Sequence, residues 1–201
     1  MRKQVTFAAV AAMLAMGLGT TPAKVTAAGG TPKAEQQNLQ ELFSIFHGRK
    51  PKGDRITANL QSETEVPTVM SVGRGRFEAE IDDDTVEYEL SFENLEGVVT
   101  QSHIHIGQAT FTGGIMVWLC NTATNPGPAS FTGPACPAAP GGTVTGTIKP
   151  SDVLAVTTQG IQLGDFTDFV QSLKKELAYV NVHSTMSPGG EIRGQINRKG
   201  H

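Results

Sequence analysis

The chain contains 201 residues, of which 38% are hydrophobic and 17% charged, and its formal net charge is −3. An acidic balance argues against a nucleic-acid partner, which would favour clustered Lys and Arg side chains. No stretch of the chain reaches the about 20 apolar residues that a membrane-spanning helix requires. The length fits one ordinary domain with a hydrophobic core of its own and additional terminal segments.

Residues 1–28 have the three parts of a secretory signal peptide. The segment starts with basic residues, continues with an apolar run over residues 5–18, and ends with small residues suited to cleavage near Ala27 or Ala28. A short membrane anchor is the alternative, but the apolar run is too short to span a bilayer. Cleavage would remove three positive charges and change the formal net charge from −3 to −6. We therefore expect a protein that is secreted or periplasmic.

A polar segment over residues 29–54 follows the predicted signal peptide. Within it, Gln36–Phe46 has apolar residues at spacings of three and four, which predicts a short helix. The linker-like stretch Lys50–Asp54 ends this segment. We therefore place the domain at residues 55–197 and a short tail at residues 198–201.

Most of the domain shows the period-two alternation of half-buried β-strands. Gly- and Pro-rich turns separate the alternating stretches, which gives seven or eight short strands. This pattern predicts an all-β fold, an antiparallel Greek-key β-sandwich or barrel. The predicted strands are residues 55–60, 77–81, 86–93, 100–106, 115–120, 143–148, 178–183 and 191–196.

One segment breaks the alternation and predicts a short inserted helix. Asp165 can cap its N-terminus, and Asp168 lies where a carboxylate favours the helix dipole. An apolar stripe is expected to lay this helix across one end of the sheet. The stripe consists of Phe166, Phe169, Val170, Leu173 and Leu177.

The chain has two cysteines, Cys120 and Cys136. In an oxidising compartment an isolated pair is expected to form a disulfide. The loop between them is rich in Pro, Gly, Thr and Ala and has no apolar period, so it cannot organise itself by packing. Two free thiols for metal or redox work are the alternative, although their spacing fits no metal-ligand motif.

Three histidines form the most informative group of candidate site residues in the chain. His103 and His105 are two residues apart in a predicted strand, so both imidazoles lie on the face opposite Ile104. His183 ends a later strand on the face opposite Val182. If the two strands are neighbours, the three imidazoles converge, and imidazole-only sites suit copper or zinc. The alternative is a set of surface or hydrogen-bonded histidines, with His183 capping a turn.

Five segments carry a family resemblance. They are Leu60–Pro67, His103–Gly107, Gly113–Ile115, Tyr179–His183 and Pro188–Ile196. Together they resemble the CHRD domain, which is named after chordin and also occurs in secreted bacterial proteins. The similarity runs from about Ile56 to Asn197. It implies an extracellular β-sandwich module with no general catalytic activity, whose partner is an extracellular protein or a cell surface.

A second resemblance concerns the Cu/Zn superoxide dismutases, which are also Greek-key β-barrels. The order of His103, His105 and His183 is similar to that of their copper ligands. No bridging histidine lies between His105 and His183, and no zinc-ligand cluster is visible, so this resemblance implies a copper-only site. It also implies anion guidance by a positive residue such as Arg193. The alternative for Arg193 is a strand-surface ion pair with Glu191.

Two functional hypotheses follow. The first is an exported, non-enzymatic binding module that presents loops or a sheet edge to its partner, with the three histidines as a possible metal site. The second is a copper-binding redox protein with His103, His105 and His183 as ligands. No Ser-His-Asp or paired-carboxylate arrangement in the sequence indicates another catalytic class.

Overall fold

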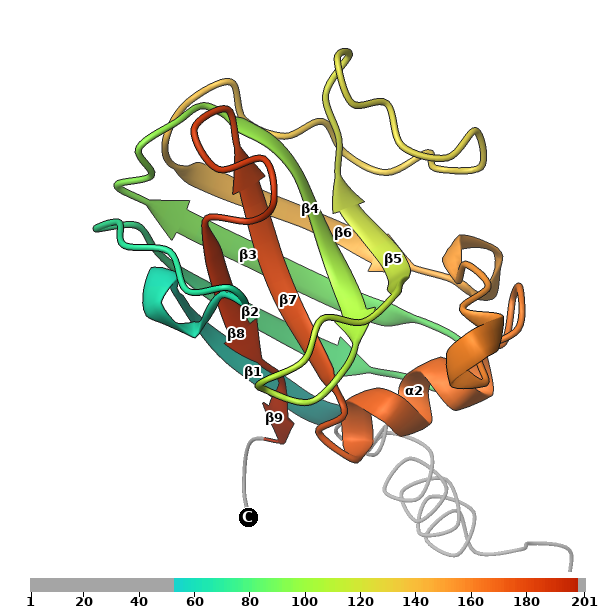
Figure 1. Cartoon of the computed structure of the whole chain (residues 1–201). Coiled ribbons are helices and arrows are strands. Elements are labelled where there is room, and N and C mark those ends of the chain that lie inside the picture. Colours follow the sequence, from blue (N-terminus) through green and yellow to red (C-terminus); the bar gives the residue numbers. More distant parts are fainter. Residues whose placement is uncertain (1–52, 199–201) are drawn as a thin grey trace, which may run out of the picture. The chain divides into compact units, whose positions relative to one another are not determined.

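The computed structural model describes residues 53–198 (Figure 1). The predicted signal peptide, the predicted helix over Gln36–Phe46 and the end of the tail lie outside the described residues. No helix among the described residues is long and apolar enough to cross a membrane.

The strands are β1 (Asp54–Gln61), β2 (Arg74–Ile81), β3 (Val86–Glu93), β4 (Val99–Ile106), β5 (Ile115–Cys120), β6 (Gly142–Ile148), β7 (Ala178–Ser184), β8 (Ile192–Gln195) and β9 (Asn197–Arg198). The helices are the 3-10 helices η1 (Ser62–Thr64), η2 (Pro150–Asp152) and η3 (Thr157–Gln159) and the α-helix α2 (Phe166–Lys174).

The strands form one antiparallel sheet that curls into a nearly closed barrel (Figure 1). Their order is β5-β4-β7-β8-β1-β2-β3-β6, and β9 lies against β1. β3 and β4 follow each other in sequence but are far apart in this order, so the chain crosses between two parts of the sheet. The predicted all-β antiparallel fold with a single short α-helix is therefore confirmed for the described residues.

The period-two alternation correctly marks the strand faces in the first half of the domain. In β3, Val86, Tyr88, Leu90 and Phe92 are buried, whereas the glutamates between them are exposed. The buried set of each strand points into the barrel and contributes to one hydrophobic core. Because only one face of these strands is covered, alternation is the expected sequence pattern.

β7 departs from this pattern, because all seven of its residues are buried. Val180 and Val182 pack in the barrel core. Tyr179, Asn181 and His183 lie on the opposite face, where loops cover them instead of solvent. The barrel thus has a second, polar buried layer outside β7, and the candidate site lies in that layer.

The inserted helix α2 begins as predicted and ends earlier. The Asp165 carboxylate accepts a hydrogen bond of 3.0 Å from the Asp168 N–H, and Phe169 and Leu173 are fully buried. Figure 1 shows α2 lying across one end of the barrel. The inclusion of Leu177 in the apolar stripe is wrong: the helix ends at Lys174, Glu176 has a φ of +59°, and Leu177 is 38% exposed.

Cys120 and Cys136 form the expected disulfide, with an Sγ–Sγ distance of 2.05 Å. The bridge ties residues 121–135, here called the cystine loop, to the end of β5. In the chain-entropy model, closing a loop of this length stabilises the folded state by about 3 kcal/mol. The cystine loop is therefore held next to the seam between β5 and β6, the two strands at the ends of the sheet order.

Candidate metal centre

The three predicted histidines lie together on the face of β4 and β7 that points away from the core. β4 and β7 are antiparallel neighbours, and His103 pairs with Asn181. His183, two residues further along β7, therefore lies diagonally across from His103. The ring centroid of His103 is 4.9 Å from that of His183 and 5.4 Å from that of His105.

Connecting segments cover this face, so the histidine cluster is buried although it lies outside the barrel. His103, His105 and His183 are 1%, 8% and 7% exposed. Figure 1 shows the connection over residues 107–114 crossing β7 and the connection over residues 62–73 alongside β8. The sequence-based alternative of histidines on the open surface is therefore wrong.

Backbone carbonyls orient two of the three imidazoles. Nδ1 of His183 lies 2.9 Å from the Pro188 carbonyl oxygen, and Nδ1 of His105 lies 2.9 Å from that of Gly113. Because a carbonyl only accepts, the contact of His183 places the proton on Nδ1 and leaves the Nε2 lone pair free, and the contact of His105 favours the same form. A hydrogen bond from one ring nitrogen to a backbone carbonyl is typical of metal-ligating histidines.

His105 has a competing partner at its other nitrogen. Its Nε2 lies 3.1 Å from Oδ1 of Asn181, which also only accepts. A neutral imidazole carries one N–H, so it donates either to Asn181 or to the Gly113 carbonyl. A metal ion bound at Nε2 would select the Nδ1–H form and replace the Asn181 contact.

Burial keeps the cluster neutral. It lowers the pKa of His103 to about 2, with further lowering from His183 and then His105. Burial also lowers the pKa of His105 to about 4, opposed by the hydrogen bond to Gly113, and it lowers the pKa of His183. Neutral imidazoles are the form that binds metals, so the cluster is ready to act as a ligand set near neutral pH.

The distances within the cluster are close to those of a ligand set. One nitrogen from each histidine can be chosen so that all three lie within 4.8 Å of one another. With metal–nitrogen bonds of about 2.0–2.1 Å, two ligands of one ion are at most about 4.2 Å apart. An ion that binds all three nitrogens therefore requires the largest of these separations to close to about 4.2 Å or less.

Aromatic rings pack against the cluster from two sides. Trp118 on β5 is the register partner of His103, and the two ring centroids are 4.2 Å apart. Tyr179 is the register partner of His105, with parallel rings 4.8 Å apart. These cross-strand contacts fix the ring positions. No sequence pattern predicts the contact with Trp118, because it depends on the β4–β5 register.

Arg193 lies in the same buried layer and not on the strand surface. It is 1% exposed, and its guanidinium carbon lies 3.4 Å above the ring centroid of Tyr179. One of its nitrogens donates to the carbonyls of Gln108 and Phe111, at 2.9 and 2.8 Å. The alternative of a surface pair with Glu191 is wrong: Glu191 accepts from the Glu96 N–H at 2.6 Å and from the Ser184 hydroxyl.

Glu65 is a member of this layer that the sequence analysis did not single out. It is 5% exposed, and burial raises its pKa to about 7, opposed by the charge of Arg193 and by hydrogen bonds from the Val66 N–H and Asn181. Gly190 makes room for it, since a Cβ there would lie 2.4 Å from Oε1 of Glu65. A buried carboxylate thus lies near a buried guanidinium, next to the residue that contacts His105.

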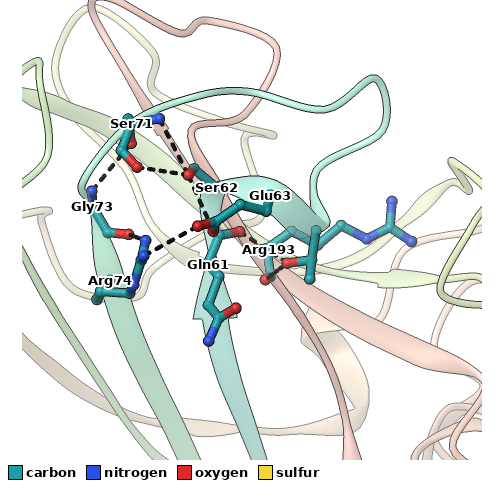
Figure 2. A network of polar contacts seen from close by, with 8 residues as sticks. Gln61, Ser62, Glu63, Ser71, Gly73, Arg74 and Arg193 are labelled. Atoms are coloured by element: carbon teal, nitrogen blue, oxygen red, sulfur yellow. Dashed lines mark hydrogen bonds and ion pairs between the residues drawn. The ribbon is translucent and has the colours of Figure 1, made fainter.

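The segment that carries Glu65 is tied down by the polar network of Figure 2. The Ser62 hydroxyl donates to the Ser71 carbonyl at 2.8 Å, and the Arg74 guanidinium contacts Glu63 at 3.1 Å. The Thr64 hydroxyl donates to the backbone carbonyl of Arg193. The network therefore holds the start of the 62–73 connection against β8.

Unsatisfied polar atoms concentrate in this layer. Among the described residues, six buried side-chain nitrogen or oxygen atoms have no hydrogen-bond partner. Five of these six belong to Glu65, His103, His183 and Arg193, including both ring nitrogens of His103. Each such atom costs about 1–3 kcal/mol of desolvation, so a group of them indicates a place where a ligand, ion or water supplies the missing partner.

The buried histidines predict that the metal-free domain loses stability in acid. Unfolding restores their pKa to about 6.5, so below that pH the unfolded state binds more protons and is favoured. Each histidine contributes up to about 1.4 kcal/mol per pH unit as the pH falls toward its folded value. Glu65 acts in the opposite sense, because folding raises its pKa from 4.5 to about 7. Its contribution to the free energy of unfolding is fully present below about pH 4.5 and is lost as the pH rises toward 7. Since three histidines oppose one carboxyl, urea unfolding should give a smaller free energy at pH 5 than at pH 7. An equal or larger value at pH 5 would contradict the buried neutral cluster.

The fold and this layer define a class of protein: an antiparallel β-barrel module with a loop-covered cluster of three neutral histidines. The CHRD domain family model matches residues 56–196, and the chain belongs to this family. No curated protein and no solved structure matches the chain. The resemblance to Cu/Zn superoxide dismutases accordingly stays a prediction.

Proposed function

We propose that this CHRD domain is an exported binding module that holds one copper ion through His103, His105 and His183. The observation that carries the proposal is the convergence of three neutral imidazoles whose nitrogens lie within 4.8 Å of one another. Secretion is part of the same proposal, supported by the leader-like residues 1–28 and by the disulfide, which is stable in oxidising compartments.

The donor set favours copper over other metals. Three imidazoles without a carboxylate or thiolate do not suit magnesium or calcium, which prefer oxygen ligands. For the same nitrogen donors, copper(II) binds more tightly than zinc. The two backbone carbonyls on Nδ1 support the assignment. Among the described residues, Nε2 of His183 has no hydrogen-bond partner, and an ion at Nε2 of His105 would replace only the contact with Asn181.

Copper titration of the purified exported chain tests this proposal. We expect one equivalent of Cu(II) per chain and a nitrogen-ligated type 2 EPR signal. The copper should also quench the fluorescence of Trp118, the sole tryptophan, because its ring lies 4.2 Å from His103. His103→Ala should abolish both signals.

His47→Ala is the matched control, since His47 lies outside the family match and should leave binding unchanged. Zinc should compete only at higher concentration. No stoichiometric copper binding tighter than about micromolar, or unchanged binding in His103→Ala, would refute the proposal.

The redox alternative needs a further property, turnover of an oxidant such as superoxide. Arg193 does not support the guidance of superoxide to the site, because its guanidinium is 1% exposed and donates hydrogen bonds to two backbone carbonyls. We therefore propose binding without turnover. A superoxide assay on the copper-loaded chain separates the two functions.

A further inference from the structure

A groove lies at the seam where the barrel is not closed by hydrogen bonds. β5 and β6 stand at the two ends of the sheet order, and the cystine loop lies over the space between them. The groove has a volume of about 530 Å³, within the range of about 300–1,000 Å³ typical of small-ligand sites. We call it the seam groove. Its lining comes from β5, β6, the cystine loop and the segment around η2.

Aromatic side chains form one part of the lining. Trp118 and Phe131 are both half-buried, and their ring centroids are 6.2 Å apart. Tyr88 reaches the seam from β3, and its hydroxyl donates to the Leu119 carbonyl at 2.5 Å. Gly146 lets it pass, because a Cβ there would lie 2.6 Å from that hydroxyl. The groove is thus lined by two half-buried aromatic rings and by the anchored ring of Tyr88.

Hydroxyl groups form the other part. Thr132, Thr147 and Ser151 line the groove and are exposed. Within the described residues, none of their hydroxyls makes a hydrogen bond to another protein group. One cation and one anion, Lys149 and Asp152, also line the groove, so its formal charge is balanced.

This lining selects a ligand class. A phosphate-bearing ligand would favour clustered basic groups, and a lipid would favour aliphatic side chains without free hydroxyls. Aromatic faces beside free hydroxyls suit a neutral ring whose faces carry C–H groups and whose edge carries hydroxyls. We propose that the seam groove binds a neutral oligosaccharide, with a sugar ring packed against Trp118 and its hydroxyls bonded to Thr147 and Ser151.

The site is distinct from the histidine cluster but shares one residue with it. Trp118 contacts His103 and also lines the groove. Because the chain has a single tryptophan, its fluorescence reports on the groove without interference from other tryptophans. The oligosaccharide proposal does not require the metal, so the metal-free chain should bind the sugar.

Titration of the metal-free exported chain with cellohexaose and chitohexaose tests the proposal. We expect at least one of the two to shift the Trp118 emission and to bind with a Kd below about 1 mM by calorimetry. Glucose should bind at least tenfold more weakly than the hexasaccharide that binds.

Two variants locate the site. Trp118→Ala should weaken binding at least tenfold, with folding checked by circular dichroism. The double variant Thr147→Val/Ser151→Ala changes only exposed side chains, so we expect it to fold normally. It should weaken sugar binding about threefold to tenfold. This result keeps the test valid even if Trp118→Ala does not fold. Thr145→Val is the control, because Thr145 is exposed on the same strand but does not line the groove.

Three results would overturn the proposal. The first is no binding of either hexasaccharide at 10 mM, roughly tenfold above the weakest Kd expected. The second is binding that Thr147→Val/Ser151→Ala and Trp118→Ala leave unchanged. The third is binding of an acetylated Gly-Ser-Thr hexapeptide in place of both sugars, which would assign the groove to an extended peptide.

Discussion

Replacing Arg193 with alanine is expected to lower the free energy of unfolding by about 3–5 kcal/mol. The guanidinium is 1% exposed and donates to the carbonyls of Gln108 and Phe111, which fastens the 107–114 connection over β7. Its removal takes a donor from the Phe111 carbonyl and one of two donors from the Gln108 carbonyl, which also accepts from the Phe111 N–H. It also leaves the Tyr179 ring without its cation and Glu65 buried without a nearby positive charge. Urea unfolding monitored by circular dichroism measures the effect.

A double-mutant cycle separates the charge contribution from the packing contribution. Arg193→Ala/Glu65→Gln should lose at least about 1 kcal/mol less than the sum of the two single variants, because the neutral amide no longer needs the guanidinium. Arg76→Ala is the matched control. Arg76 forms an exposed ion pair with Glu78, with side chains 49% and 45% exposed, and such pairs contribute less than about 1 kcal/mol. A loss at Arg193 no larger than the loss at Arg76 would contradict a structural role for the buried guanidinium.

Copper is expected to raise the melting temperature of the purified chain by roughly 5–10 °C. An ion that binds only the folded state at one hundred times its Kd stabilises that state by about 2.7 kcal/mol. For a domain of this size, each kcal/mol shifts the melting temperature by about 2–4 °C. Differential scanning calorimetry without Cu(II) and with free Cu(II) at one hundred times its Kd measures the shift.

The same comparison in His103→Ala isolates the site. Because each variant is compared with its own metal-free form, a change in intrinsic stability does not affect the result. The shift should vanish in His103→Ala and persist in His47→Ala. An equal shift in His103→Ala would place the copper elsewhere on the chain.

Local pattern predicted most of the fold. The alternation in β3 and the Gly- and Pro-rich turns identified short antiparallel strands, since one buried face leaves a period of two in the sequence. The N-cap of α2 at Asp165 was also visible, because a cap depends on neighbours along the chain. The end of α2 was not, because the left-handed backbone at Glu176 stops the helix before Leu177 can join the stripe.

The candidate site was only half visible. Alternation places His103 and His105 on one face of β4, and the same rule places His183 on the outer face of β7. The pairing of β4 with β7 joins segments about 80 residues apart, and no local pattern specifies it. Arg193 was misjudged because alternation predicts an exposed face where β8 is in fact covered by loops. Glu65 was missed because it lies in a connection that has no strand period.

The sequence alone determined the all-β class, the expected disulfide and the three imidazoles that could share an ion, because each depends on composition, spacing or the two-residue strand period. Only the tertiary structure decided that the imidazoles meet, that they are buried and neutral, and that Glu65, Asn181 and Arg193 surround them. Burial and register are set by which strands pair and which loops fold over them. Those contacts are made between residues far apart along the chain.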